Sequence, residues 1–173
     1  DVVHEHLEYY SLKSINYLME QNGLTVIDAS TNFVNGGSLR VLVTHKEKNL
    51  SKTQRYKQIL NEEEKWNLEK LETYNEYSQK IKAIIEKTKK FIMSELEKGN
   101  LVIGLGASTK GNVLLQICGI DKNLLPFISE RNLDKVGLRT LGTDIEIISE
   151  EKARELNPSA MLVIPWNFKD EIL

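Results

Sequence analysis

Two histidines flank a glutamate near the start of the chain, at His4-Glu5-His6, and Tyr9 and Tyr10 follow. Imidazole titrates near neutral pH and can take a proton from carbon when it is placed close to it, and an adjacent carboxylate stabilises the imidazolium. Metal binding is less favoured, because histidines at i and i+2 with one glutamate do not match the i, i+4 pattern of zinc helices. A general base and a polar segment without a role both remain open.

A glycine-rich segment, GLGASTKGN at residues 104–112, follows an apolar run. Glycines let backbone N–H groups approach a phosphate, the N-terminus of a following helix favours an anion, and Lys110 adds a positive charge. The segment is not a Walker A loop, because Thr109 replaces the glycine before the lysine, and its third glycine does not fit the dinucleotide fingerprint. An anion-binding loop and a purely structural turn are the two interpretations.

Two further polar segments each follow a predicted strand. Glu130 and Arg131 come after one strand, where they would hold a ribose hydroxyl and a phosphate if the strand ends line a ligand crevice, or would form a solvated loop. Trp166 and Asn167 follow the last apolar strand. The tryptophan either stacks on a base or covers the core, and the sequence alone does not separate the two.

The elements that must position these residues change character along the chain. A helix is expected from residue 12, with Ser11 as its N-cap and Asn22-Gly23 at its end, followed by strands at 24–29 and 39–44 around the Gly36-Gly37 turn. Residues 51–98 contain no glycine or proline and predict one long amphipathic helix or two. Such a helix packs across a sheet or, with its irregular three-four seam, forms a coiled-coil dimer.

The last third of the chain alternates strands and helices. Strands are expected at 101–104, 125–129, 145–148 and 161–164, helices at 112–118 and 150–156, and a loop at 106–110. Strands that alternate with helices form a parallel sheet. The sequence therefore predicts an α/β fold with a Rossmann-like domain.

Composition narrows the protein class. The 173 residues carry a net charge of -2 with a pI near 6.0, unlike the basic domains that bind nucleic acid. The one cysteine, Cys118, lies in an apolar run and is expected to be buried, and a single thiol fits a reducing compartment. No apolar stretch approaches the ~20 residues of a membrane span, and no signal peptide opens the chain. We expect a cytoplasmic protein without a membrane partner. Asp1 at the start and the start of a helix that is cut short at 169–173 indicate a fragment.

Five strings in this order resemble the S-adenosylmethionine-dependent C-methyltransferases that act on nucleotide-linked keto-deoxysugars. The strings are DVVHEHLEYYSL at 1–12, NGGSLR at 35–40, GASTKGN at 106–112, ERN at 130–132 and PWN at 165–167. The resemblance covers nearly the whole chain, with 46–98 the least distinctive part. It implies that residues 1–45 end a class I methyltransferase domain, 46–98 form a helical linker, and 99–173 form a Rossmann-like domain that binds the nucleotide-sugar.

The resemblance also implies cofactors and an incomplete enzyme. The donor S-adenosylmethionine would bind mostly upstream of this chain, and zinc would belong to an N-terminal domain that is absent here. The chain would then be inactive alone.

Roles for individual residues follow from the same resemblance. His6 would be the base that removes the proton α to the sugar ketone, with Glu5 as its carboxylate partner. Family members often carry an aromatic residue where this chain has Val3. Tyr9, Tyr10 or an upstream residue would then have to donate to the enolate oxygen, or this member acts on a different substrate. The predicted substrate contacts are Tyr10, Gly37, Ser38 and Arg40 near the sugar, Ser108, Lys110 and Asn112 at the diphosphate, and Glu130, Arg131, Trp166 and Asn167 at the nucleoside.

Two other functions fit part of the sequence. An NAD- or nucleotide-binding domain of another enzyme would explain the glycine segment and Glu130, but not His4-Glu5-His6. A helical assembly module would use residues 51–98 and leave the glycine segment without a role. The sugar, the methylated carbon, the nucleotide base and the oligomeric state are not readable from the sequence.

Overall fold

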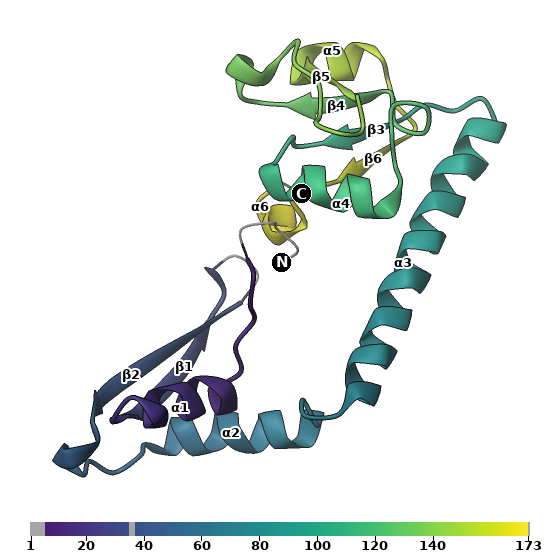
Figure 1. Ribbon diagram of the computed structural model, residues 1–173. Coiled ribbons are helices and arrows are strands. Elements are labelled where there is room, and N and C mark those ends of the chain that lie inside the picture. The colour runs from purple at the N-terminus through teal and green to yellow at the C-terminus, as the bar shows by residue number, and fades with distance from the viewer. Residues whose placement is uncertain (1–5, 35–36, 173) are drawn as a thin grey trace. The chain divides into compact units, whose positions relative to one another are not determined.

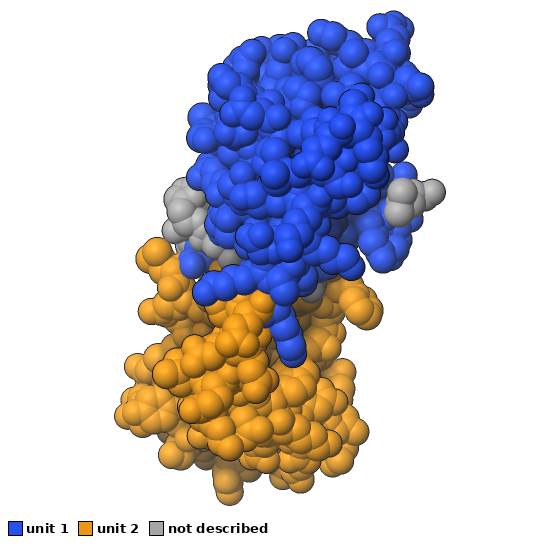
Figure 2. All heavy atoms as spheres, turned by 90° about the vertical axis from the view of Figure 1, so that its right-hand side faces the viewer, with its two compact units in different colours: residues 1–6, 80–173 blue, residues 7–79 orange. Residues whose placement is uncertain are grey.

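The computed structural model describes residues 6–34 and 37–172, and these form two compact units. One unit contains residues 7–79, and the other contains residues 80–173 together with residues 1–6 (Figure 2). Helix α3, Leu71–Glu97, begins in the first unit and ends in the second. Within the described residues, no helix is both long enough and apolar enough to cross a membrane.

The unit of residues 7–79 is built on a two-stranded antiparallel sheet. It comprises α1 (Leu12–Gln21), β1 (Leu24–Asn32), β2 (Ser38–His45), a 3-10 turn (Lys46–Lys48) and α2 (Gln54–Trp66). The Ser11 hydroxyl accepts from the Ser14 N–H and caps α1, and Gly23 follows the helix at a φ of 70°. The expected first helix and both strands are confirmed.

Helix α2 packs against this sheet rather than extending away from it. The core of the unit consists of Leu12, Val26, Ala29 and Tyr56, all at most 3 % exposed. The Glu63 carboxylate of α2 accepts from the backbone N–H groups of Leu12 and Lys13 at the start of α1. A carboxylate is favoured there because the first N–H groups of a helix lack partners and carry partial positive charge.

The long glycine-free segment forms two helices, α2 and α3. They are separated at Asn67, which adopts the left-handed conformation with φ 51°. Along α3, Tyr77 and Ile84 are 63 % and 65 % exposed, whereas Ile92 in the C-terminal part is buried. Ile92 and the neighbouring Leu96 pack on the core of the parallel sheet. The last turns of α3 thus anchor that helix to the second unit.

The unit of residues 80–173 contains a four-stranded parallel sheet in the order β5-β4-β3-β6 (Figure 1). The elements are β3 (Val102–Leu105), α4 (Thr109–Cys118), β4 (Phe127–Glu130), η3 (Leu133–Lys135), β5 (Glu146–Ser149), α5 (Glu150–Glu155), β6 (Ala160–Val163), η4 (Trp166–Phe168) and α6 (Lys169–Ile172). The predicted α/β fold with a parallel sheet is confirmed. The predicted loop at 106–110 is two residues too long, because Ser108 caps α4 and the helix begins at Thr109.

The parallel sheet is covered on both faces. Val102 and Ile128 join Leu115 of α4 and Ile92 of α3 in one core, and Cys118 packs partly buried at its margin. Successive side chains of a strand point to opposite faces. On the other face, Ile103 and Ile148 accordingly pack with Ala153 of α5, and Figure 1 shows α4 and α5 on opposite sides of the sheet.

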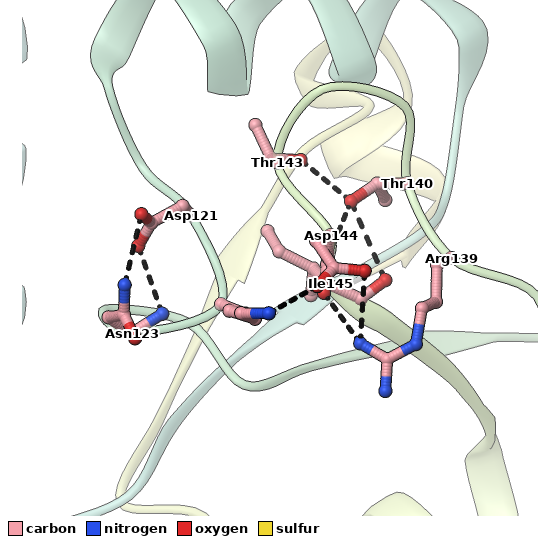
Figure 3. A network of polar contacts seen from close by, with 8 residues as sticks. Asp121, Asn123, Arg139, Thr140, Thr143, Asp144 and Ile145 are labelled. Carbon is pink, nitrogen blue, oxygen red and sulfur yellow. Dashed lines mark hydrogen bonds and ion pairs between the residues drawn. The ribbon is translucent and has the colours of Figure 1, made fainter.

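A polar turn before β5 contains a network of hydrogen bonds and ion pairs (Figure 3). The buried hydroxyls of Thr140 and Thr143 lie 2.6 Å apart, and the Thr140 hydroxyl accepts from the Ile145 N–H at 2.9 Å. Arg139 donates to the carbonyl of Asp144, a residue with φ 56°, at 2.8 Å. These contacts satisfy polar groups that the turn would otherwise bury without partners.

Candidate functional site

The chain reverses direction across the sheet between β3 and β6. From β3 it passes through α4 to β4 on one side, and from β5 it returns through α5 to β6 on the other side. In open parallel sheets, ligands bind outside the carboxyl ends of the strands at such a switch point. The residues that follow β3, β4 and β6 are therefore the candidate site, and they include the three polar segments of this unit that the sequence singled out.

The glycine segment makes a tight turn at the end of β3. Gly106 has a φ of 84°, and its N–H donates to the Ser129 carbonyl of β4 at 2.8 Å. A Cβ atom at this position would lie 2.7 Å from Cγ of Pro165, which follows β6. Only glycine fits there. Its small size therefore allows the ends of β3, β4 and β6 to approach one another at this position.

Most backbone donors of this loop already have partners. Five N–H groups donate to acceptors inside the unit, namely those of Gly106, Ala107, Ser108, Gly111 and Asn112. The Ser108 hydroxyl accepts from the Gly111 N–H at 3.0 Å and acts as the helix cap. An anion at this loop would therefore meet the first turn of α4, at Thr109 and the half-buried Lys110, and not a row of open N–H groups. The predicted contact of Ser108 with a diphosphate would compete with its capping role.

Glu130 lies at the end of β4 with its side chain 13 % exposed. Its carboxylate accepts from the N–H groups of Ala107 at 2.8 Å and Asn132 at 2.9 Å, and the Lys135 ammonium lies 3.7 Å away. Burial alone would raise the pKa of Glu130, but these backbone hydrogen bonds and the lysine outweigh it and hold the pKa below its usual range. An ionised Glu130 thus bridges the glycine loop and the end of β4.

A cleft of about 700 Å³ opens on the α5 face of the same strand ends. Gly106, Glu130 and Arg131 line it, as do residues of α5, η4 and α6 that the sequence did not single out, among them Glu150, Arg154, Phe168 and Glu171. Glu150 lies between two arginines, 3.5 Å from the Nε of Arg131 and 3.5 Å from a guanidinium nitrogen of Arg154. Arg154 follows Glu150 by one helical turn, which is the sequence signal that would have found this pair.

The segment after β6 carries Trp166 and Asn167. Trp166 is 57 % exposed, so it does not cover the core. The Oδ1 atom of Asn167 is buried and has no hydrogen-bond partner among the described residues. A buried acceptor without a donor is unfavourable by about 1–3 kcal/mol, so this atom calls for a donor from water or a ligand.

The remaining predicted contacts belong to the unit of residues 7–79. The Tyr10 hydroxyl donates to the Glu8 carboxylate, which raises the pKa of the phenol. The Ser38 hydroxyl donates to the Val34 carbonyl at 3.0 Å, and Arg40 donates to the Ser30 hydroxyl at 3.3 Å.

Gly37, at a φ of 127°, closes the same turn with its N–H on the Val34 carbonyl. Gly37, Ser38 and Arg40 thus already bind within the hairpin, whereas Tyr10 binds Glu8. The predicted contacts of all four residues with a sugar stay predictions.

The predicted base and its surroundings are only partly described. His6 is exposed and belongs to the unit that contains the glycine loop. Its predicted partner Glu5 lies outside the described residues, as do Val3, His4 and Gly36. Across residues 6–34 and 37–172, no group of three or more histidine, cysteine or acidic side chains forms a metal site.

Comparison with known proteins gives the family. Residues 33–173 match the C-methyltransferase C-terminal domain. The C-methyltransferase NovU of Streptomyces niveus is similar to this chain, with 31 % identity over 172 residues, which are 99 % of the chain and 41 % of that protein. The chain spans less than half the length of this curated relative. The predicted family is confirmed, and the chain belongs to the C-methyltransferase C-terminal domain family.

Proposed function

We propose that this chain forms the substrate-binding and base-carrying part of a C-methyltransferase. The match of residues 33–173 to the C-methyltransferase C-terminal domain carries this proposal, and the name of the relative NovU supports it. The substrate is a keto-deoxysugar linked to a nucleoside diphosphate, and the reaction adds a methyl group to the carbon α to the ketone. Residues 1–45 form the end of the methyltransferase domain, and residues 99–173 form the domain that binds the nucleotide-sugar. Residues 46–98 form the helical linker between these two domains.

The parallel sheet suits the nucleotide end of such a substrate. The first turn of α4 combines a helix N-terminus with Lys110, and both favour a diphosphate. The exposed ring of Trp166 could stack on a base. The buried Oδ1 of Asn167, which has no partner among the described residues, could accept a hydrogen bond from an N–H of that base. Arg131 adds a cation at the rim of the cleft. These groups lie at the strand ends where parallel sheets bind ligands.

The chemical step starts with proton transfer. His6, assisted by Glu5, removes the proton α to the ketone, and the resulting enolate carbon is the nucleophile that receives the methyl group. The enolate oxygen needs a hydrogen-bond donor placed in advance. Tyr9 and Tyr10 are the candidates in this chain, and Tyr10 would have to exchange its hydrogen bond to Glu8 for one to the enolate. The negative charge that develops on this oxygen makes such a donor more effective in the transition state than in the ground state.

The methyl donor proposed is S-adenosylmethionine, but the described residues do not form its site. Residues 7–79 supply an antiparallel hairpin and, where described, no glycine-rich turn from strand to helix. The glycine loop of the other unit has most of its N–H groups bound, and Ile164 fills the space beside Gly111. We therefore assign no residue of this chain to the donor. The family resemblance likewise puts zinc in another domain, and the cytoplasm is the expected compartment.

The proposal is tested with His6→Ala in the full-length protein. The assay is exchange of the substrate α-proton with deuterated water, followed by methyl transfer, using a thymidine-diphosphate-linked keto-sugar. We expect both rates to fall about 10²–10⁴-fold, the usual contribution of a general base, while substrate affinity stays within a few-fold. His45, at the end of β2, provides the matched control, and His45→Ala should retain activity.

Two results would contradict the assignment. Retained exchange in His6→Ala removes His6 from the role of base. Tight binding of NAD, with no binding of any nucleoside-diphosphate sugar, would replace the methyltransferase substrate by a dinucleotide and revive the NAD-binding alternative.

A further inference from the structure

Two side chains, one at the end of β4 and one in the segment after it, bind the backbone of a single residue of the glycine loop. The Ala107 N–H donates to Oε2 of Glu130 at 2.8 Å, and Nζ of Lys135 donates to the Ala107 carbonyl at 2.8 Å. The same ammonium lies 3.7 Å from the Glu130 carboxylate. Both backbone polar groups of Ala107 are thus bound by charged side chains that also attract each other. We call this arrangement the Ala107 clamp.

The clamp acts where the direction of the following helix is decided. Ala107 lies between Gly106, which turns the chain with a φ of 84°, and Ser108, the N-cap of α4. Left alone, a turn that begins with glycine has many accessible backbone conformations. Charge-assisted hydrogen bonds on the next residue remove most of that freedom, because they are shorter and about twice as strong as neutral ones.

The clamp is itself fixed by local structure. The second oxygen of Glu130 accepts from the Asn132 N–H at 2.9 Å, and the Asn132 side chain accepts from the Asp134 N–H at 3.0 Å to cap the η3 turn. That short turn, Leu133–Lys135, brings Lys135 back over the loop. The lysine contact spans 28 residues of sequence, so no local pattern reveals it.

We propose that Glu130 and Lys135 are positioning residues that set the conformation in which the glycine loop and the start of α4 bind the substrate diphosphate; this inference rests on the proposed function. In this role Glu130 acts through the loop and is not primarily a ligand of the ribose. Lys135 balances the charge of Glu130, so the clamp does not present an uncompensated carboxylate to the incoming anion.

The test compares Lys135→Met with Lys135→Arg in the full-length protein. Methionine keeps the length of the side chain but cannot donate, whereas arginine keeps the charge and the donor. Lys122→Met is the matched control, because Lys122 pairs with Asp144 in the turn before β5, outside the glycine loop. The readouts are amide hydrogen exchange of the peptide covering residues 104–112, the affinity for thymidine diphosphate, and the melting temperature.

We expect Lys135→Met to speed exchange at this loop and weaken thymidine diphosphate binding, each about ten-fold, which is the scale of one charge-assisted hydrogen bond. Lys135→Arg should return both values to within about three-fold of the wild type, and Lys122→Met should leave both unchanged. If Lys135 only stabilised the fold, Lys135→Met would lower the melting temperature, and loop exchange and thymidine diphosphate affinity would not change together.

Unchanged exchange in Lys135→Met would overturn the clamp, and faster exchange with unchanged affinity would overturn its role in binding. Failure of the proposed function looks different, because the wild-type protein would then not bind thymidine diphosphate at all. The dependence of loop exchange on Lys135 would in that case still support the clamp as the element that sets the loop.

Discussion

Replacement of Gly111 by alanine gives a sharp test of how closely α4 packs on the sheet. A Cβ atom at this position would lie 2.1 Å from Cγ2 of Ile164 and 2.9 Å from the Ser108 hydroxyl. Ile164 is 6 % exposed and packs in the main core, so it has little room to move. The helix must therefore shift away from the residue that follows β6.

The expected loss of stability has three parts. Overpacking a core is unfavourable by about 1–3 kcal/mol, and disturbing the Ser108 cap adds about 1 kcal/mol. Alanine in place of glycine in a helix returns up to about 1 kcal/mol. We expect a net loss of about 1–3 kcal/mol, the opposite sign from an ordinary glycine-to-alanine change in a helix. With a urea m-value near 1 kcal/mol per M, the midpoint should fall by about 1–3 M.

The assay follows Trp166 fluorescence during urea unfolding in a Trp66→Phe background. The chain has two tryptophans, one in each compact unit, so this background reports on residues 80–173 alone. A double-mutant cycle with Ile164→Ala identifies the cause, because this change removes Cγ2 and leaves Cβ at an ordinary 3.5 Å. The penalty of Gly111→Ala should then fall below about 1 kcal/mol. An unchanged or higher midpoint for Gly111→Ala alone would refute the packing argument.

Two further predictions concern polar contacts. Thr140→Val should destabilise the same unit by about 1–3 kcal/mol in urea unfolding, because the Ile145 N–H loses its acceptor inside the core, whereas Thr140→Ser should be much milder; equal losses would contradict this explanation. In the other unit, hydrogen bonds from Thr53 and then Arg55 hold the pKa of Asp28 below its usual range, so its stabilisation is present above pH ~4 and is lost as the pH falls through the lowered value. Asp28→Asn should therefore flatten the acid side of a melting-temperature profile, and an identical profile would show that the Asp28 charge contributes nothing.

The sequence by itself determined the elements and their class. Ser11 was predicted as the cap of α1, and such a cap is local because hydroxyl and N–H lie within three residues of each other. Ser108 and Ser149 cap α4 and α5 by the same kind of bond, but they were not predicted as caps. Alternating apolar strands and helices likewise predicted the parallel sheet and its Rossmann-like class. The helix break at Asn67 was left open between one helix and two, because a left-handed asparagine gives a weak signal.

Only the tertiary structure decided how the candidate site is built. The glycines and the lysine in residues 104–112 fitted either an anion-binding loop or a structural turn, and the sequence did not show that Glu130 binds the Ala107 N–H and Lys135 its carbonyl. These partners come from the next strand and its turn, so their approach depends on strand pairing, which local sequence patterns do not encode. The cleft on the α5 face also gathers residues from separate elements. The types of side chain that do chemistry were therefore readable from the sequence, whereas their partners were fixed by the order of strands in the sheet.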